Sequence, residues 1–195
     1  MSARYDEEWI ASLLDVEKRL GDTTPKQCLA TAGMQPGHTV VDYGCGPGLF
    51  TFPAAQIAGP DGTVYAVDIE PRMVTLIERK VGERGAGNVT AVLNDGQGAP
   101  LPPDTADFLV LGQVLHYPEE TEGRVAMARD VARLLKPDGR ALVIEWAPED
   151  ESSSRMGPGD VESIVGEAEL RVGPPQPLGP RQYMMIATHR PSTAG

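Results

Sequence analysis

Three glycines alternate with other residues directly after a short apolar run, and this arrangement constrains the fold more than any other feature of the chain. Val40 and Val41 form the run and Asp42 is an acid after it; Gly44, Gly46 and Gly48 then precede a stretch that is able to begin a helix. Because glycine has no Cβ, such a turn lets the backbone approach a ligand closely. The pattern predicts a buried strand, a ligand-binding turn and a helix, as in doubly wound α/β sheets.

The spacing of the glycines differs from the spacing that binds a dinucleotide. In the dinucleotide fingerprint, a third small residue stands five positions after the first glycine, and here that position is Leu49. Asp42 stands two residues before the first glycine, which argues against a pyrophosphate and for a cationic ligand. A nicotinamide-dependent oxidoreductase is therefore a less favoured alternative.

Length and charge favour one class of function and exclude others. The chain has 195 residues and a formal net charge of -11 at pH 7. This length fits one domain, residues 1–195, with a core of its own. A nucleic-acid backbone binds clustered Lys and Arg, so we expect no nucleic-acid partner.

The cysteines and the first residues indicate the environment of the protein. Cys28 and Cys45 are its two cysteines, and Cys45 lies inside the glycine turn, so neither a disulfide framework nor a Cys-rich metal site is supported. The first residues are polar, and no apolar run approaches ~18 residues. We expect a cytoplasmic protein that is not exported, does not enter a membrane and holds no metal.

Hydrophobic periodicity divides the chain into strands and helices that alternate over most of its length. Strands are expected at residues 39–43, 63–68, 88–93, 106–111, 141–146, 169–172 and 182–188, and helices at residues 6–20, 25–33, 49–58, 71–84, 119–136 and 160–168. This alternation predicts an α/β protein with a doubly wound, Rossmann-like sheet. A helical segment, residues 1–34, precedes the sheet, and residues 147–160 are expected to form a flexible surface loop.

An acidic residue ends the second expected strand. Asp68 follows Gly44 by 24 residues, and a carboxylate at this place is able to accept both hydroxyls of a ribose. Ile69 follows it and would cover one face of an adenine. The alternative is that Asp68 only caps the helix that begins near Pro71.

The sequence Asp-x-Gly-x-Gly-x-Gly at residues 42–48 resembles motif I of the class I S-adenosylmethionine-dependent methyltransferases. Residues 133–140, which precede an apolar strand, resemble a frequent pattern of the same family. Over about residues 25–190 the chain is similar to the small methyltransferases of the ubiquinone and menaquinone biosynthesis group. The resemblance implies a seven-stranded sheet, mostly parallel, with an antiparallel last strand.

The resemblance also implies where S-adenosyl-L-methionine would bind. The glycine turn, with Cys45 inside it, would pass under the methionine and ribose portions, and Asp42 would orient the amino-acid end. Asp95 would receive the adenine amine while the amide of Gly96 contacts a ring nitrogen; a simple Asp-Gly turn is the alternative there. Gln113, after the fourth strand, would face the methionine end.

Chemistry at the acceptor is expected in the segment that follows the fourth strand. His116 is a candidate general base, because imidazole exchanges a proton near neutral pH, although it could equally cap the next helix. The segment lacks the Asn/Asp-Pro-Pro-Tyr/Phe sequence with which related enzymes hold a planar amine, so methylation of a base is disfavoured. Tyr5 and Trp9 would line an acceptor pocket or serve packing alone.

Two places depart from the family's pattern. Tyr43 occupies a position that is usually aliphatic, and residues 96–98 are unusually rich in glycine. The region that would hold the acceptor is also short. These departures leave the acceptor open and do not alter the expected cofactor.

The sequence therefore predicts a methyltransferase that moves a methyl group from S-adenosyl-L-methionine to a small molecule by in-line displacement. A protein of the same fold that binds the cofactor without catalysis, as a regulatory or partner subunit, is the alternative. Arsenite methylation is disfavoured because it relies on several cysteines. The sequence does not indicate the acceptor atom or the oligomeric state.

Overall fold

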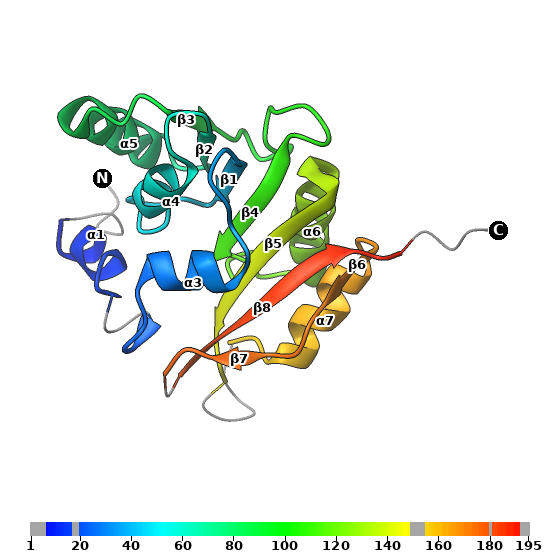
Figure 1. Cartoon of the computed structure of the whole chain (residues 1–195). Helices are drawn as coiled ribbons and strands as arrows, with labels where there is room; N and C mark the ends of the chain where they lie inside the picture. The colour runs from blue at the N-terminus through cyan, green and yellow to red at the C-terminus, as the bar shows by residue number, and fades with distance from the viewer. Residues whose placement is uncertain (1–6, 17–19, 149–154, 180, 192–195) are drawn as a thin grey trace.

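The computed structural model describes residues 7–16, 20–148, 155–179 and 181–191 (Figure 1). The described strands are β1 (Thr39–Tyr43), β2 (Thr63–Asp68), β3 (Val89–Leu93), β4 (Ala106–Gly112), β5 (Leu135–Trp146), β6 (Leu170–Val172), β7 (Gln176–Pro177) and β8 (Gln182–His189). The described helices are α1 (Glu7–Leu13), α3 (Pro25–Thr31), α4 (Thr51–Ala58), α5 (Pro71–Arg84), α6 (Thr121–Leu134) and α7 (Pro158–Gly166).

The strands form one sheet in the order β3-β2-β1-β4-β5-β8-β6, and the short β7 pairs with β8. Strands β1 to β5 run parallel to one another, whereas β8 is antiparallel to its partners β5, β6 and β7. The strand order reverses between β1 and β4, and in such sheets ligands bind beyond the carboxyl ends of the strands at this point. The turn after β1 therefore lies where a ligand is expected.

Helices cover both faces of the sheet (Figure 1). Side chains of β1 alternate between the two, so that Val40 packs with residues of α3 and α4 while Val41 packs with residues of α6 and α7. Both valines are fully buried. Asp42 therefore faces α4 and Tyr43 faces α6, so the side chains of these two neighbours lie on opposite faces of the sheet.

Several element ends agree with the sequence prediction. The bounds of β1, β2 and α5 are those expected, and α5 ends where Gly85 adopts a left-handed conformation with φ of +62°. The predicted α/β sheet, mostly parallel with an antiparallel last strand, is confirmed.

Several local predictions were wrong. The described residues form eight strands rather than seven, because the two-residue β7 lies between the last two expected strands. Helix α6 ends at Leu134 and not at Lys136, since Leu135 is already extended and pairs with Ala106. Helix α7 begins at Pro158, two residues before the expected start at residue 160. At this end the backbone amide of Gly157 donates to the Asp160 carboxylate.

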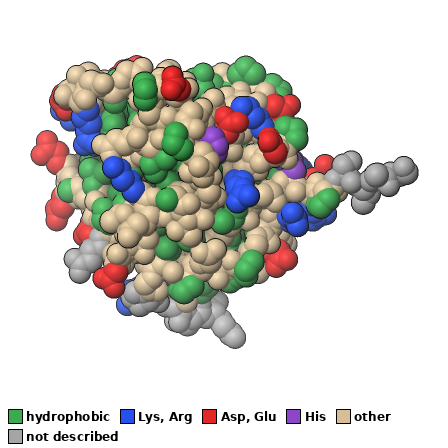
Figure 2. Space-filling model, viewed as in Figure 1, with side chains coloured by type: hydrophobic (Ala, Val, Ile, Leu, Met, Phe, Trp, Pro, Cys, Tyr) green, Lys and Arg blue, Asp and Glu red, His purple; other side chains and the backbone are tan. Residues whose placement is uncertain are grey.

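The N-terminal helix is shorter than expected over the described residues, since α1 ends at Leu13. Tyr5 and residues 149–154 of the expected surface loop lie outside the described residues. No described helix combines the length and apolarity that crossing a bilayer requires. On the face shown in Figure 2, the described Lys and Arg side chains are scattered among acidic and apolar ones and form no basic patch.

Candidate functional site

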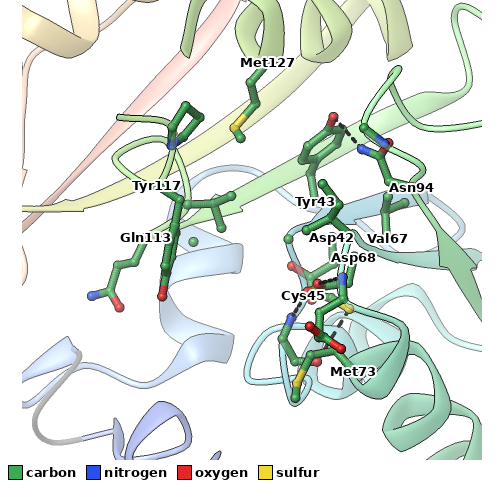
Figure 3. A pocket seen from close by; sticks show the side chains of 18 of the residues that line it. Asp42, Tyr43, Cys45, Val67, Asp68, Met73, Asn94, Gln113, Tyr117 and Met127 are labelled. Carbon is green, nitrogen blue, oxygen red and sulfur yellow. Dashed lines mark hydrogen bonds between the residues drawn. The ribbon is translucent and has the colours of Figure 1, made fainter. Parts of the chain in front are cut away.

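A cavity of about 760 Å³ lies at the carboxyl ends of β1, β2 and β4. Its walls come from the glycine turn, the end of β2, the loop after β3, the segment after β4, and from α1 and α6. Figure 3 shows Asp42, Asp68 and Asn94 on one side of it and Tyr117 and Met127 on the other. This volume is typical of a small-molecule site, where a ligand is largely enclosed.

The three glycines of the turn have different structural roles. Gly44 and Gly46 line the cavity with positive φ values of +71° and +50°. A Cβ on Gly44 would lie 2.6 Å from Val114, so this position needs glycine for packing. A Cβ on Gly46 would have only Leu13 within 4 Å among the residues that the structure describes. Gly48 does not line the cavity, because a Cβ there would meet Phe52 and Ile77. Gly46 is therefore the position where backbone opens toward a ligand.

Cys45 and Asp42 lie in the floor of the cavity. Asp42 is 2% exposed, and its Oδ2 accepts a hydrogen bond from the hydroxyl of Thr51 at the start of α4. Burial raises the pKa of this carboxyl from 3.8 to about 7, although the Thr51 hydrogen bond opposes the shift. Burial also raises the pKa of the Cys45 thiol well above its ordinary value.

Asp68 joins the glycine turn to the start of α5. Its Oδ2 accepts the amide of Gly46 at 2.8 Å, and its Oδ1 accepts the amide of Glu70 at 2.9 Å. Burial raises its pKa, and these two hydrogen bonds oppose the shift. The cap of α5 is Glu70, which accepts the amide of Arg72, so Asp68 is not the capping residue. Its carboxylate is instead held at the cavity wall by two backbone amides.

The loop after β3 brings only part of its predicted set into the cavity. From this loop Gly96 lines the cavity, next to Ile69, which follows β2 and is 65% exposed. Asp95 is exposed and outside the cavity wall, and its Oδ1 accepts the amide of Gln97 at 2.9 Å. Asn94, which sequence analysis did not select, is buried and lines the cavity.

Gln113 lines the opposite wall in an unusual backbone conformation. Its φ is +61° and its side chain is buried. Its backbone amide donates to the carbonyl of Ile144 at 2.7 Å. A non-glycine residue in the left-handed region costs about 1–3 kcal/mol, and such strain is concentrated at functional sites. This conformation turns the chain sharply from β4 into the segment that holds His116.

His116 lies just behind the cavity wall rather than in it. Its ring stacks on Tyr117, with centroids 4.6 Å apart, and Tyr117 does line the cavity. The Nδ1 of His116 is 2.8 Å from Oε2 of Glu145, a carboxylate at the end of β5. The structure thus pairs the predicted histidine with an acid that sequence analysis had placed in a strand without a role.

Glu145 is fully buried, and its second oxygen, Oε1, has no hydrogen-bond partner among the described residues. Buried carboxylates of this kind are costly and are concentrated at functional sites. The signal that could have found it is the single acid inside the apolar run of residues 141–146. A charged residue near the carboxyl end of a buried strand lies where ligands bind.

The remaining wall is mainly apolar. It includes Trp9 and Leu13 of α1, Val114 after β4 and Met127 of α6. Trp9 thus lines the cavity, and its contact with an acceptor stays a prediction. In the part of the chain that the structure describes, no three His, Cys, Asp or Glu side chains are grouped to hold a metal ion.

The part of the chain that builds this cavity matches the model of a known family. Residues 40–139 match the family described as a methyltransferase domain. An arsenite methyltransferase of Halobacterium salinarum is 34% identical over 148 residues, which cover 74% of this chain and 36% of the relative. A nocamycin O-methyltransferase of Saccharothrix syringae is 34% identical over 163 residues, which cover 83% and 54%. A demethylmenaquinone methyltransferase of Anoxybacillus flavithermus is 29% identical over 120 residues, which cover 62% and 49%.

One solved structure matches this chain over most of the length of both chains. The crystal structure of a SAM-dependent methyltransferase from Aquifex aeolicus has a TM-score of 0.82 and 27% identity, covering 94% of this chain and 98% of that chain. By contrast, the chain spans only 36% to 54% of the length of the three curated relatives above.

Proposed function

Since the chain belongs to the methyltransferase domain family, and within it to the class I S-adenosylmethionine-dependent methyltransferases similar to the ubiquinone and menaquinone biosynthesis group, we propose that it transfers a methyl group from S-adenosyl-L-methionine to a small-molecule acceptor. The observation that carries the proposal is the carboxylate of Asp68, fixed at the cavity wall by the amide of Gly46.

The cavity fits this cofactor at both ends. Gly46 offers open backbone beneath Leu13, where a Cβ would project into the space. Asp68 would hold the ribose through its oriented oxygens, and the exposed apolar surface of Ile69 beside Gly96 would lie against the adenine. The acidic Asp42 in the floor suits the cationic portion of the ligand.

S-adenosyl-L-methionine supplies a methyl group on a sulfonium sulfur, which is already a strong electrophile. The chain contributes alignment of the acceptor and exclusion of water, and these effects are worth up to ~7–11 kcal/mol in well-oriented reactions. The apolar wall of Trp9, Val114 and Met127 serves both purposes. A flat, apolar small molecule suits such a wall, and the formal net charge of -11 disfavours a nucleic-acid acceptor.

His116 would take up the proton that an acceptor hydroxyl or similar group loses. An ionised Glu145 only accepts hydrogen bonds, so it holds the proton on Nδ1 and leaves Nε2 of His116 able to accept. The buried carboxylate then stabilises the imidazolium that forms, as opposite charge does in a site of low dielectric. Because His116 lies behind Tyr117, movement of Tyr117 or a bridging water would connect it to the acceptor.

The two cysteines give little support to arsenite as the acceptor. Both are buried, and burial raises the pKa of the Cys28 thiol to about 11, so neither thiol is poised as a thiolate. Cys28 also does not line the cavity. The alternative of a non-catalytic, cofactor-binding subunit is disfavoured by the pairing of His116 with Glu145, because cofactor binding does not require this buried acid.

The test is thermal unfolding with S-adenosyl-L-methionine, S-adenosyl-L-homocysteine and NAD, each at about 100 times an expected dissociation constant. Binding at that excess stabilises the folded protein by about 2.7 kcal/mol, or about 5–10 °C for a chain of this size. We expect a shift with the first two compounds and none with NAD. Transfer of a labelled methyl group to a panel of small aromatic acceptors then separates an enzyme from a binding subunit.

A further inference from the structure

A buried hydroxyl connects β1 to the loop after β3 and to α6. Tyr43 is 6% exposed and its hydroxyl donates to Oδ2 of Asp130 at 2.9 Å. The same hydroxyl accepts the side-chain amide of Asn94 at 3.0 Å, a contact drawn in Figure 3. This explains why a tyrosine stands at a position that is aliphatic in the family's pattern.

Asp130 and Arg133 of α6 hold residues 94–101, the segment that begins at Asn94. Oδ2 of Asp130 accepts the amide of Ala99 at 2.7 Å. The Arg133 guanidinium donates to the carbonyls of Leu101 and Ala99 at 2.6 and 2.8 Å, and to Oδ1 of Asp130 at 2.9 and 2.7 Å. Hydrogen bonds between charged and neutral groups are stronger than neutral ones, so these contacts fix the segment firmly.

The glycines of the segment agree with this close attachment. Gly98 has a φ of +112°, and a Cβ there would lie 3.0 Å from Oδ1 of Asp130. Only glycine therefore fits between the segment and α6 without displacing the carboxylate. The glycine-rich residues 96–98 and the unusual Tyr43 are two parts of one arrangement.

The segment held in this way forms one wall of the cavity. Asn94, Gly96, Gln97 and Gly98 all line it, on the side where Ile69 would contact the adenine. Hydrogen bonds within the segment are local, such as the one that the backbone amide of Gly96 donates to Oδ1 of Asn94. At its start, the backbone amide of Asn94 donates to the carbonyl of Asp68 at the end of β2. Beyond that point, the position of the segment relative to the cavity depends on the contacts from Tyr43 and α6.

We propose that Tyr43, Asp130 and Arg133 are positioning residues for the cofactor, which hold residues 94–101 against its adenine end. This inference rests on the proposed function. Arg133 is informative because it does not line the cavity, so it affects the ligand only through the groups it holds, the segment and Asp130. Helix α6 also supplies Met127 to the apolar wall, so one helix positions both the adenine segment and the acceptor side.

The experiment measures dissociation constants of S-adenosyl-L-homocysteine and 5′-methylthioadenosine by calorimetry, at a temperature where every variant is folded. The variants are Tyr43→Phe, which removes only the hydroxyl, and Arg133→Met, which keeps the side-chain stem. Tyr65→Phe on β2 and Arg129→Met on the exposed face of α6 are matched controls. Methylthioadenosine shares the adenosine portion but lacks the amino-acid end, so it reports on the adenosine side, adenine and ribose together.

We expect Tyr43→Phe and Arg133→Met each to weaken both ligands by about tenfold, and by the same factor for the two ligands. Each control changes binding by less than about twofold, and Arg133→Lys recovers part of the loss. The double variant loses less than the product of the two single losses, because both residues act through the same segment.

Unchanged affinity in Tyr43→Phe and Arg133→Met, with wild-type binding intact, overturns the inference. A loss confined to S-adenosyl-L-homocysteine also overturns it, since the amino-acid end would then be the part affected. Failure of the wild-type protein to bind either compound is a different result, which counts against the proposed function itself.

Discussion

His116 and Glu145 lie 29 residues apart in the chain and meet through Nδ1 and Oε2 at 2.8 Å. The carboxylate side chain is 1% exposed and the histidine side chain is 28% exposed. Of the two, only the histidine is therefore accessible from outside the protein core. In the proposed role of His116, an ionised Glu145 behind it would hold the proton on Nδ1 and balance the charge that the ring acquires.

This pairing predicts a loss of turnover without a loss of cofactor binding. We expect His116→Gln to lower the methyl-transfer rate by about 10²–10⁴-fold toward acceptors that must lose a proton, the usual contribution of a general base. Neither His116 nor Glu145 lines the cavity, so S-adenosyl-L-homocysteine binding changes by less than about twofold. Single-turnover rates and calorimetry measure the two quantities.

Glu145→Gln and His38→Gln complete that comparison. Glu145→Gln keeps the shape but removes the charge, so we expect an intermediate loss of rate. His38 lies in the turn before β1, outside the cavity wall, and its substitution leaves the rate unchanged. A wild-type rate in His116→Gln would show that the acceptor needs no base from this residue.

For Asp68 we predict weaker cofactor binding, the effect that substitution of His116 is expected to spare. Asp68→Asn removes the charge that would accept the ribose hydroxyls, and we expect S-adenosyl-L-homocysteine to bind about 10–100-fold more weakly. Asp95→Asn in the same titration tests the predicted adenine contact, which the exposed turn does not provide as it stands. An equal loss in both variants would mean that the turn rearranges around the ligand, and an unchanged Asp68→Asn would contradict the site.

Local signals predicted the elements that place this cavity. The strand Thr63–Asp68 has both its ends marked in the sequence, by the turn at Gly62 and by the acid, and it was predicted to the residue. Helix α5 likewise lies between Pro71 and a left-handed Gly85. The end of α6 was missed because Leu135 pairs with Ala106, and a helical pattern does not record pairing with a strand 29 residues away.

The parts of the site that the sequence did not reveal depend on contacts across the sheet. Tyr43 and Asp130 are 87 residues apart, and their hydrogen bond exists only because β1 and α6 share one face. Glu145 was visible as an acid in an apolar run, but its partner was not. Gly48 belonged to the right motif and still serves packing, since spacing alone does not say which glycine faces the ligand.

Asp42 predicts a pH dependence of stability. Its pKa rises from 3.8 to about 7 on folding, so between these values the folded protein binds more protons than the unfolded chain. Stability from this group is therefore present at low pH and is lost as pH rises toward 7, by up to about 4 kcal/mol.

Asp42→Asn isolates this effect, because asparagine keeps the hydrogen bond from Thr51 and does not ionise in this range. We expect the variant to gain stability relative to wild type between about pH 5 and about pH 8, in the direction set by linkage. Urea unfolding at both pH values measures the difference between the two proteins, so the other titrating groups cancel. A constant difference across this range would mean that Asp42 ionises normally in the folded protein.

Gly46 and Gly37 share a left-handed conformation, with φ of +50° and +78°, and differ in what surrounds them. An alanine at either position costs about 1–2 kcal/mol of unfolding free energy, the ordinary penalty for a Cβ in this region. At Gly37 the methyl group meets no described residue within 4 Å, whereas at Gly46 it enters the cavity near Leu13. We expect Gly46→Ala to bind S-adenosyl-L-homocysteine at least about tenfold more weakly and Gly37→Ala to bind it normally. Urea unfolding and calorimetry on both variants separate the two effects, and equal affinity in the pair would mean that the ligand does not pass over Gly46.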